Sequence, residues 1–304
     1  MRIGILGHMG SIGSRHLANL ISLGITTGVY DVANYPEHHR QIVINESDAI
    51  IIASPTEHHL RDLGDSLTAG KHVFIEKPIA TKDSPLLREL LKNAKSANRI
   101  IFVGNNLRYH ACIKLAKEKL LLGAIGNPLW ASITVAQKTD RLPYFRDGVT
   151  LNWGAHEIDL ALYLLGPAKV LCASVRNAIF TDKATNLDDI SDDMADIILE
   201  HATDCRSTIH LDYVTSPEIR ATTIIGDKGQ LAIDLVQRWA CLISSDGKTE
   251  QFQFTDSWDS NYLEEIKAFI SRVEGRNDCI GATGEDGLAT LEIIKTVQNA
   301  AVST

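Results

Sequence analysis

The sequence has few cysteines and no long apolar run, and each shortage excludes a class of protein. Its five cysteines are scattered and form no C-x-x-C pair, which predicts reduced thiols and gives no ligand spacing for a metal. No apolar stretch approaches the ~18 residues of a membrane span. Gly4 and Gly7 interrupt the opening segment, where a signal peptide needs an apolar core. We therefore expect a cytoplasmic protein with no metal and no membrane partner.

Basic residues are fewer than acidic ones. The 30 Lys and Arg residues against 38 Asp and Glu residues give a formal net charge of −8. This balance argues against a nucleic-acid partner, because such a partner requires a basic face, but it leaves room for a local basic pocket. With 304 residues, 44% of them hydrophobic, the chain is long enough for about two globular domains.

Short β-branched segments alternate with helical patterns through residues 1–122, which we take as the first domain. The alternation predicts an α/β domain with a doubly wound parallel sheet, the Rossmann type. Ser84 and Pro85 mark one helix start, as a cap and a first-turn proline. Only 17 positions separate Asp31 from Ala49, so we expect the helix of that crossover to be trimmed or lost. The predicted strands are 3–6, 27–30, 49–53, 72–75 and 100–103.

The pattern changes after residue 122. Turn-rich links such as Gly226–Gly229 and Ser245–Lys248 join the later apolar segments, which predicts hairpins and an antiparallel sheet. We expect an α+β domain over 123–284, and a last helix over 285–304 that packs back on the first domain. The predicted strands are 130–137, 170–178, 195–201, 207–213, 219–225 and 230–235, and the predicted helices are 155–165, 259–273 and 284–301.

A glycine-rich turn follows the first strand. The strand runs into Gly7, Gly10 and Gly13, and a helix follows these glycines. Glycines let a backbone approach a pyrophosphate closely, and a helix N-terminus offers unpaired N–H groups. The spacing is G-x-x-G-x-x-G, not the commoner G-x-G-x-x-G, so the role of each glycine stays open. A glycine-rich turn with a capping aspartate is the purely structural alternative.

Asp31 ends the second strand, 18 positions after Gly13, close to the ~20 expected of a ribose-binding carboxylate. Such a carboxylate accepts hydrogen bonds from both ribose hydroxyls and repels a 2′-phosphate. No Arg or Lys follows before Arg40. The sequence therefore favours NAD over NADP as the cofactor.

Three more segments, with the glycine loop, give the chain its family resemblance. They are Ser54–His59, the Glu76-Lys77-Pro78 motif after Gly70-Lys71-His72-Val73, and Gly148–Asp159. Together they resemble the Gfo/Idh/MocA family, named after glucose–fructose oxidoreductase, inositol dehydrogenase and a rhizopine-catabolism protein. The resemblance covers nearly the whole chain, and Glu-Lys-Pro is its most specific part. It implies a Rossmann domain, a second domain with a large, open, mostly antiparallel sheet, and hydride transfer between a nicotinamide and a carbinol carbon of a sugar or cyclitol.

Matching motif to motif assigns the cofactor side of the site. Gly7, Gly10, Ser11, Ile12 and Gly13 hold the pyrophosphate, and Asp31 holds the ribose. The nicotinamide side is assigned to Ser54, Pro55, Thr56 and His59, with Glu76 and Lys77 beside the reacting carbon and Arg108 near both substrate and cofactor.

The resemblance assigns catalysis to Lys77 and His156. A neutral histidine removes a hydroxyl proton well because its pKa lies near operating pH. A lysine ammonium stabilises a developing alkoxide, and burial or a nearby cation can lower its pKa until the amine is itself a base. Which of the two accepts the proton stays open, and a helix-start histidine is the structural alternative for His156.

One position departs from the family pattern. Many members have an aspartate four residues before the histidine, where this chain has Asn152. An amide still hydrogen-bonds a substrate but cannot balance an imidazolium charge. Asp159 shares a helix face with His156 and is a substitute orienter. Tyr144 and Arg146 lie in a predicted loop before this segment, either as substrate contacts or as plain surface residues.

These residues support an NAD-dependent dehydrogenase of a sugar, a cyclitol or a derivative. Two alternatives stay open: an NAD-dependent glycosidase that oxidises its substrate transiently, and a non-catalytic sensor of dinucleotide or sugar. Lys77 counts against the sensor and Asn152 mildly for it. The resemblance also implies a homodimer or homotetramer that forms through the C-terminal sheet.

Overall fold

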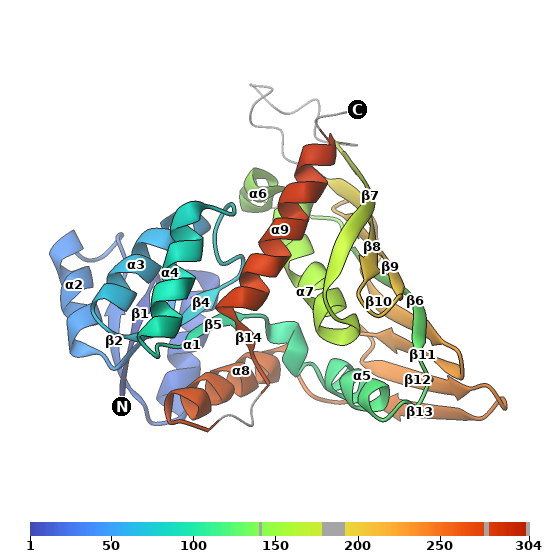
Figure 1. The fold of residues 1–304 in the computed structure, drawn as a ribbon. Coiled ribbons are helices and arrows are strands. Elements are labelled where there is room, and N and C mark those ends of the chain that lie inside the picture. Colours follow the sequence, from blue (N-terminus) through green and yellow to red (C-terminus); the bar gives the residue numbers. More distant parts are fainter. Residues whose placement is uncertain (140–141, 178–191, 277–279, 302–304) are drawn as a thin grey trace. The chain divides into compact units, whose positions relative to one another are not determined.

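The computed structural model describes residues 1–139, 142–177, 192–276 and 280–301, with the backbone alone at 142–146 and 301. Two compact units form: Met1–Tyr109 with Ser257–Leu291, and His110–Asp256 with Glu292–Thr304. Each is described by itself below. The fold class predicted from the sequence, a Rossmann-type domain and a domain with a mostly antiparallel sheet, is confirmed (Figure 1).

The first unit contains a six-stranded sheet in the order β14-β5-β4-β3-β1-β2, parallel except for β14. Each inner strand is short and apolar, and all four residues of β3 are buried, as expected for parallel strands covered on both faces. Successive strands pair in a fixed register, with Ile5 opposite both Val29 and Ile51. The strands are β1 (Arg2–Leu6), β2 (Thr26–Tyr30), β3 (Ala49–Ile52), β4 (His72–Glu76), β5 (Ile101–Gly104) and β14 (Ala282–Thr283).

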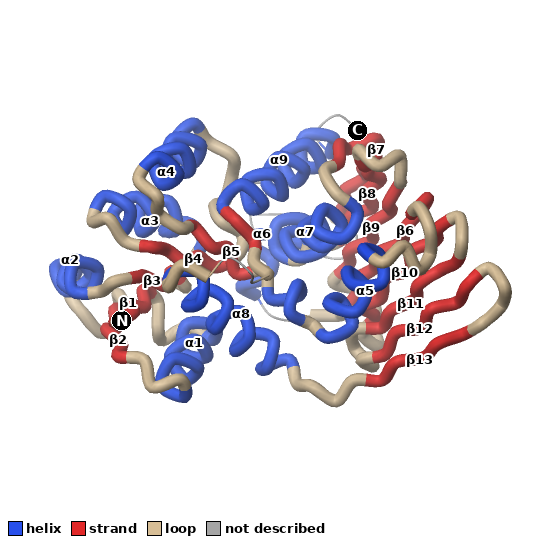
Figure 2. Tube along the Cα trace, turned by 60° about the horizontal axis from the view of Figure 1, so that its bottom comes forward, coloured by secondary structure: helices blue, strands red, loops and turns tan. Residues whose placement is uncertain are grey.

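Helices cover both faces of this sheet (Figure 2). One face carries α2 (Glu37–Glu46), α3 (His59–Thr68) and α4 (Pro85–Ser96), and the other carries α1 (Ser11–Ser22) and α8 (Trp258–Val273). The helix α4 begins as predicted, since Ser84 Oγ accepts the Leu87 N–H at 3.2 Å. The short helices η1 (Thr56–His58) and η2 (Asn106–Tyr109) and the start of α9 (Gly284–Ala301) complete the unit.

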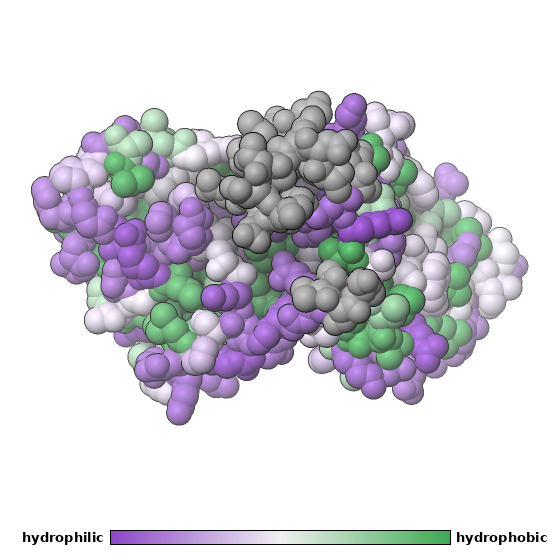
Figure 3. Space-filling model, turned by 90° about the horizontal axis from the view of Figure 1, so that it is seen from above, coloured by the Kyte–Doolittle hydropathy of each residue, from purple (hydrophilic) through white to green (hydrophobic). Residues whose placement is uncertain are grey.

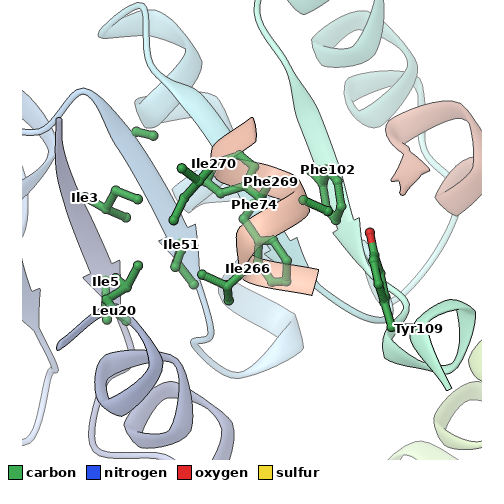
Figure 4. Packing of buried hydrophobic residues seen from close by; sticks show 12 residues of the cluster. Ile3, Ile5, Leu20, Ile51, Phe74, Phe102, Tyr109, Ile266, Phe269 and Ile270 are labelled. Atoms are coloured by element: carbon green, nitrogen blue, oxygen red, sulfur yellow. The ribbon is translucent and has the colours of Figure 1, made fainter. Parts of the chain in front are cut away.

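An apolar core lies between the sheet and α8. Phe74 and Phe102 stack at 5.6 Å between ring centroids, and Phe269 of α8 contacts both edge-on (Figure 4). Ile266 and Phe269 are fully buried in this cluster. The helix α8 therefore belongs to the first unit, whereas we expected it within a domain over 123–284.

The crossover between Asp31 and Ala49 corrects a prediction. We expected its helix to be trimmed or lost, but α2 has ten residues, as many as α3. At ~1.5 Å per residue such a helix is as long as the four- or five-residue strands beside it, so 17 positions suffice. Pro36 is the N-cap residue and starts the helix within five residues of Asp31.

The second unit contains an eight-stranded sheet in the order β13-β12-β11-β10-β6-β9-β8-β7. All neighbours are antiparallel except β6 and β9, which pair in parallel. The sequence predicted β6 to β11 but named neither β12 nor β13, although the link at 245–248 does join them. The strands are β6 (Pro128–Ala136), β7 (Ala168–Arg176), β8 (Met194–His201), β9 (Arg206–Asp212), β10 (Ile219–Gly226), β11 (Gly229–Asp234), β12 (Trp239–Ser244) and β13 (Thr249–Gln253).

Three helices, α5 (Ala111–Leu121), α6 (Leu142–Asn152) and α7 (Gly154–Leu165), pack on one face of this sheet. Because α5 contacts β11 and β12, residues 110–122 group with the second unit, whereas we expected a boundary after 122. The predicted loop that contains Tyr144 and Arg146 is instead part of α6, and the side chains of these two residues lie outside the described part of the chain. A break at Gly148, with φ of 70°, divides α6.

Surface features follow from this arrangement. On the face drawn in Figure 3, hydrophilic side chains alternate with small apolar patches.

None of the helices in the described ranges combines the length and apolar character that a membrane crossing requires. Cys112, Cys172, Cys205 and Cys241 are free thiols, and Cys279 falls outside the described residues.

Candidate cofactor site and catalytic segments

A cavity of about 620 Å³ opens at the carboxyl ends of β1, β2 and β3. It lies where the strand order reverses between β1 and β3, the place where doubly wound sheets bind ligands. Its volume is within the ~300–1,000 Å³ of small-molecule pockets. The structure brings seven of the predicted residues together here: Gly7, Gly10, Ser11, Ile12, Asp31, Ser54 and Pro55.

The three glycines of the loop have different reasons to be glycine. Gly7 has φ of +87°, and a Cβ there would lie 2.5 Å from the Ala53 carbonyl oxygen. A Cβ on Gly13 would lie 2.1 Å from the Gly7 carbonyl oxygen. Gly10 meets only that same oxygen, at 3.5 Å. Close packing therefore requires a glycine at 7, against the loop after β3, and at 13, against the Gly7 carbonyl, whereas Gly10 has only an ordinary contact at the cavity wall.

The N-terminus of α1 faces this cavity without a side-chain cap. Gly10 is the N-cap residue, and Ser11 and Ile12 begin the helix and line the cavity. The N–H groups of a first turn have no partner within the helix and stand at the positive end of its dipole. This cradle fits the pyrophosphate of a dinucleotide.

Asp31 lines the same cavity, directly after β2. Its carboxylate accepts the Met9 N–H at 3.1 Å and the Ala33 N–H at 3.0 Å. One oxygen is thus tied to the glycine loop itself, which fixes the carboxylate relative to the start of α1. A carboxylate held in this way, directly after the second strand, suits the hydroxyls of a ribose.

Four lining residues from α2, η1 and α3 were missed by sequence reasoning: Glu37, His58, Arg61 and Asp62. His58 lies within the Ser54–His59 motif but was assigned no role there. Glu37 had no signal because it begins the helix that the crossover was expected to lack, and Arg61 and Asp62 had none because they lie on α3, outside the family motifs. The cavity wall thereby carries three carboxylates, those of Asp31, Glu37 and Asp62, and one guanidinium, that of Arg61.

Arg40, the first basic residue after Asp31, is not available to a ligand. It is buried, and its guanidinium donates to Asp62 at 2.9 Å and to Asp65 at 2.7 Å. Burial lowers its pKa, but the bonds to Asp65 and Asp62 outweigh this and raise the pKa overall. Ser54 Oγ donates to the other Asp62 oxygen at 2.7 Å, so one buried acid holds α2, α3 and the loop after β3 together.

His59 supports the loops and does not line the cavity. Its ring nitrogens lie 2.9 Å from the Pro78 and Ser54 carbonyl oxygens. Burial lowers the pKa of His59 against the smaller opposing effect of these carbonyls. A neutral ring carries one N–H, so only one contact is a hydrogen bond at a time. The residue joins the loop after β3 to the end of the Glu-Lys-Pro motif, and Thr56 starts η1 beside it.

Glu76 and Lys77 stand at the end of β4. Glu76 is buried, and its carboxylate contacts His16 Nε2 of α1 at 2.7 Å and accepts the Lys77 N–H at 3.3 Å. His16 is fully buried against Phe74. The cofactor helix α1 and the backbone of Lys77 are therefore linked through one carboxylate. Sequence reasoning gave His16 no role, since a histidine inside a helix carries no signal for a partner on a strand.

Arg108 is buried against the start of α9. It donates to the Gly281 carbonyl oxygen at 3.1 Å and lies 3.5 Å from Asp286 Oδ2, which also accepts the Thr283 N–H at 2.7 Å. It does not line the cavity. These contacts tie η2 to the residue before β14 and to the first turn of α9.

In the second unit, the segment before His156 is held by a buried tyrosine. Tyr213 accepts from Asn152 Nδ2 at 3.0 Å and donates to the Gly148 carbonyl oxygen at 3.2 Å, and its ring meets Trp153 edge-on. Asp192 accepts the Thr150 N–H at 2.7 Å. Both contacts brace the break in α6 from the sheet side.

His156 and Asp159 lie on α7, the first half-buried and the second buried. Between them, Glu157 is buried and accepts from Arg220 Nε of β10 at 2.9 Å. The ion pair fixes α7 on the sheet. No group of three metal-ligating side chains occurs in the described part of the chain.

The fold and the cavity define an oxidoreductase with a dinucleotide-binding Rossmann domain. Residues 24–105 match the model of the oxidoreductase family with an NAD-binding Rossmann fold, and residues 113–232 match that of the GFO/IDH/MocA C-terminal domain. The two matches together span more than half of the chain, and it belongs to the GFO/IDH/MocA family.

Known relatives match this chain over nearly its whole length. The chain is 27% identical to myo-inositol 2-dehydrogenase of Thermotoga maritima, over 96% of this chain and 93% of that one. UDP-N-acetylglucosamine 3-dehydrogenase from Acidithiobacillus ferrooxidans superposes with a TM-score of 0.84 at 20% identity, covering 100% and 98% of the two chains. A levoglucosan dehydrogenase in complex with NADH and levoglucosan gives 0.86 at 17% identity, over 100% and 97%. The two solved structures support the fold alone.

The glycine geometry predicts that Gly13→Ala weakens NADH binding. The new Cβ must displace the Gly7 carbonyl, 2.1 Å away, so we expect affinity to fall by about tenfold or more, as for other small misplacements of a binding group. Titration of NADH fluorescence measures it. The control is Gly64→Ala in α3, where the nearest atom lies at 3.7 Å. Equal affinities for both variants would contradict the assignment.

Proposed function

We propose that this protein is an NAD-dependent dehydrogenase that oxidises a CH–OH group of a sugar, a cyclitol or a derivative, reversibly. The observation that carries the proposal is the cavity at the β1–β3 switch point, which joins an uncapped helix N-terminus to Asp31. Support comes from a family whose matched members include dehydrogenases of myo-inositol and UDP-N-acetylglucosamine.

The residues that would hold the dinucleotide divide by chemistry. The loop of Gly7, Gly10 and Gly13 and the first turn at Ser11 and Ile12 suit the pyrophosphate, and Asp31 suits the ribose hydroxyls. The nicotinamide side is assigned to Ser54 and Pro55 with support from Thr56 and His59. When bound, the nicotinamide supplies a two-electron hydride acceptor.

We infer a preference for NAD over NADP. The cavity carries three carboxylates against one guanidinium. The guanidinium of Arg40 is hydrogen-bonded to Asp62 and Asp65. A 2′-phosphate brings two further negative charges to that wall, where the ribose hydroxyls of NAD bring none.

We assign the removal of the hydroxyl proton to His156, which Asp159 would orient. Lys77 is assigned the stabilisation of the alkoxide. Glu76 and His16 fix the backbone from which Lys77 extends. Asn152 is proposed as a substrate ligand in a plane set by Tyr213, with Tyr144, Arg146 and Arg108 as further substrate contacts. Since Arg108 is held by Gly281 and Asp286, its contribution requires that these bonds yield or that it acts through them.

Absorbance at 340 nm tests the reaction. With NAD and a panel of polyols and sugars that includes myo-inositol and UDP-N-acetylglucosamine, we expect NADH to accumulate with at least one class. Glycoside cleavage without net absorbance change identifies the transient-oxidation glycosidase instead. NADH binding without turnover on any compound supports the sensor.

Substitution of the two catalytic candidates gives a second prediction. We expect Lys77→Met and His156→Ala each to lower kcat by about 10²–10⁴, the usual range for a lost acid–base or charge-stabilising group, with NADH affinity nearly unchanged. The matched controls are Lys82→Met and His38→Ala, both at exposed positions. Full turnover by His156→Ala would overturn its role.

We propose that the open face of the second sheet pairs with a second copy of the chain. Helices α5, α6 and α7 cover the other face. On the open face, small side chains adjoin across four strands, and Trp130 and Ile225 are neighbours that stay 38% and 39% exposed. Sheets that pack face to face interdigitate their side chains across about 10 Å, and short side chains allow a close approach there. The small residues are Ser132, Thr208, Thr223 and Ala232.

Light scattering with Trp130→Arg tests this interface. We expect the unsubstituted chain to form a dimer or tetramer, and a charge added within the packed face to dissociate it. Leu86→Arg, at an exposed apolar position of α4, is the control. A monomeric unsubstituted chain would contradict the proposal.

A further inference from the structure

Besides Asp31, the cavity wall carries a pair of opposite charges, Glu37 and Arg61. Glu37 begins α2, and Arg61 lies on α3, and both line the cavity. Arg61 Nη2 lies 3.1 Å from Asp62 Oδ1 and Arg61 Nη1 lies 3.8 Å from Glu37 Oε1. The single guanidinium on the wall is therefore balanced by two carboxylates.

The two carboxylates differ in what else they do. Asp62 is buried and holds Arg40 and Ser54, so its charge belongs to the scaffold. The Glu37 side chain is 60% exposed. It accepts from Tyr30 Oη at 2.9 Å, and its other oxygen lies 3.3 Å from Arg40, which keeps Asp62 and Asp65 as partners. Glu37 can therefore lose its charge without loss of a buried ion pair.

A guanidinium beside the ribose acid is the group that accommodates a 2′-phosphate in NADP-binding sites. Arg61 lines the same cavity as Asp31 and has the charge and planar donors for this task. The carboxylate of Glu37, 3.8 Å from Arg61 Nη1, opposes this role of Arg61.

We propose that Glu37 is a specificity-determining residue that excludes a 2′-phosphorylated dinucleotide by holding the charge of Arg61 in balance. The inference rests on the proposed function, because it concerns the cofactor of that same site. It adds to Asp31 a second determinant, from a helix whose presence the sequence did not predict.

The experiment titrates NADH and NADPH into the unsubstituted chain and Glu37→Gln, with dinucleotide fluorescence as the readout. Glutamine keeps an acceptor for Tyr30 and removes one charge. We expect NADPH to bind about fivefold or more tightly, the effect of one nearby charge in a solvated site, and NADH affinity to stay within about twofold.

Glu46→Gln is the matched control. Glu46 ends the same helix, is 53% exposed and pairs with Arg2, and it does not line the cavity. If Glu46→Gln gains as much NADPH affinity as Glu37→Gln, the effect comes from the net charge of the protein and the proposal is wrong.

The double variant Glu37→Gln with Arg61→Gln isolates the guanidinium. We expect the NADPH gain to disappear in it. A gain that persists would mean that Glu37 acts by direct repulsion without Arg61, and the proposed balance would be wrong. The gain should also shrink as salt rises, since exposed charges are screened.

Failure of this inference is distinct from failure of the proposed function. A chain that binds neither NADH nor NADPH contradicts the dinucleotide site itself. A chain that binds NADH, but whose Glu37→Gln variant gains nothing for NADPH, contradicts only the role of Glu37.

Discussion

The close approach of backbone to backbone at the end of β1 is the constraint on which the site depends. The missing Cβ of Gly13 allows α1 to start directly against the Gly7 carbonyl, and the missing Cβ of Gly7 allows the loop after β3 to pass beside it. Any larger residue at either position must push α1 or that loop away. This contact places the first turn of α1, Asp31 and Ser54 around one cavity.

Charge is distributed around that cavity by burial. A buried Arg40–Asp62 pair is costly to desolvate, and it is retained where it has several partners: three acids for the arginine and a serine hydroxyl for the aspartate. The pair joins α2 to α3 and to the loop after β3. It also removes one cation from the wall, so that an acidic cavity results in a protein of net charge −8.

The proposed catalytic residues share a pattern of support from buried partners. The Glu76 carboxylate links Lys77 to His16, and His59 bridges the Ser54 and Pro78 carbonyls. In the second unit, Tyr213 orients Asn152 and braces Gly148. Reactive groups need this kind of fixed surrounding, because a shift of about 1 Å in a reacting geometry is costly to rate. These supporting residues come from elements distant in sequence.

The sequence by itself determined the class of fold, the five parallel strands of the first sheet, the cap of α4, and the glycine-rich turn with an acid directly after β2. Those features are local: β-branched runs, a Ser-Pro start and glycines at fixed spacing read directly as structure. The Glu-Lys-Pro motif and the segment around His156 indicated the family in the same way.

Tertiary structure alone decided what each motif contacts. Whether Arg40 was free, whether α2 existed, and whether Glu37 and Arg61 stood beside Asp31 depended on how helices from separate crossovers packed. The membership of α8 in the first unit depended on the fit of Phe269 against Phe74 and Phe102. Such contacts join residues tens to hundreds of positions apart, and no spacing along the chain encodes the distance between two side chains that meet only after folding.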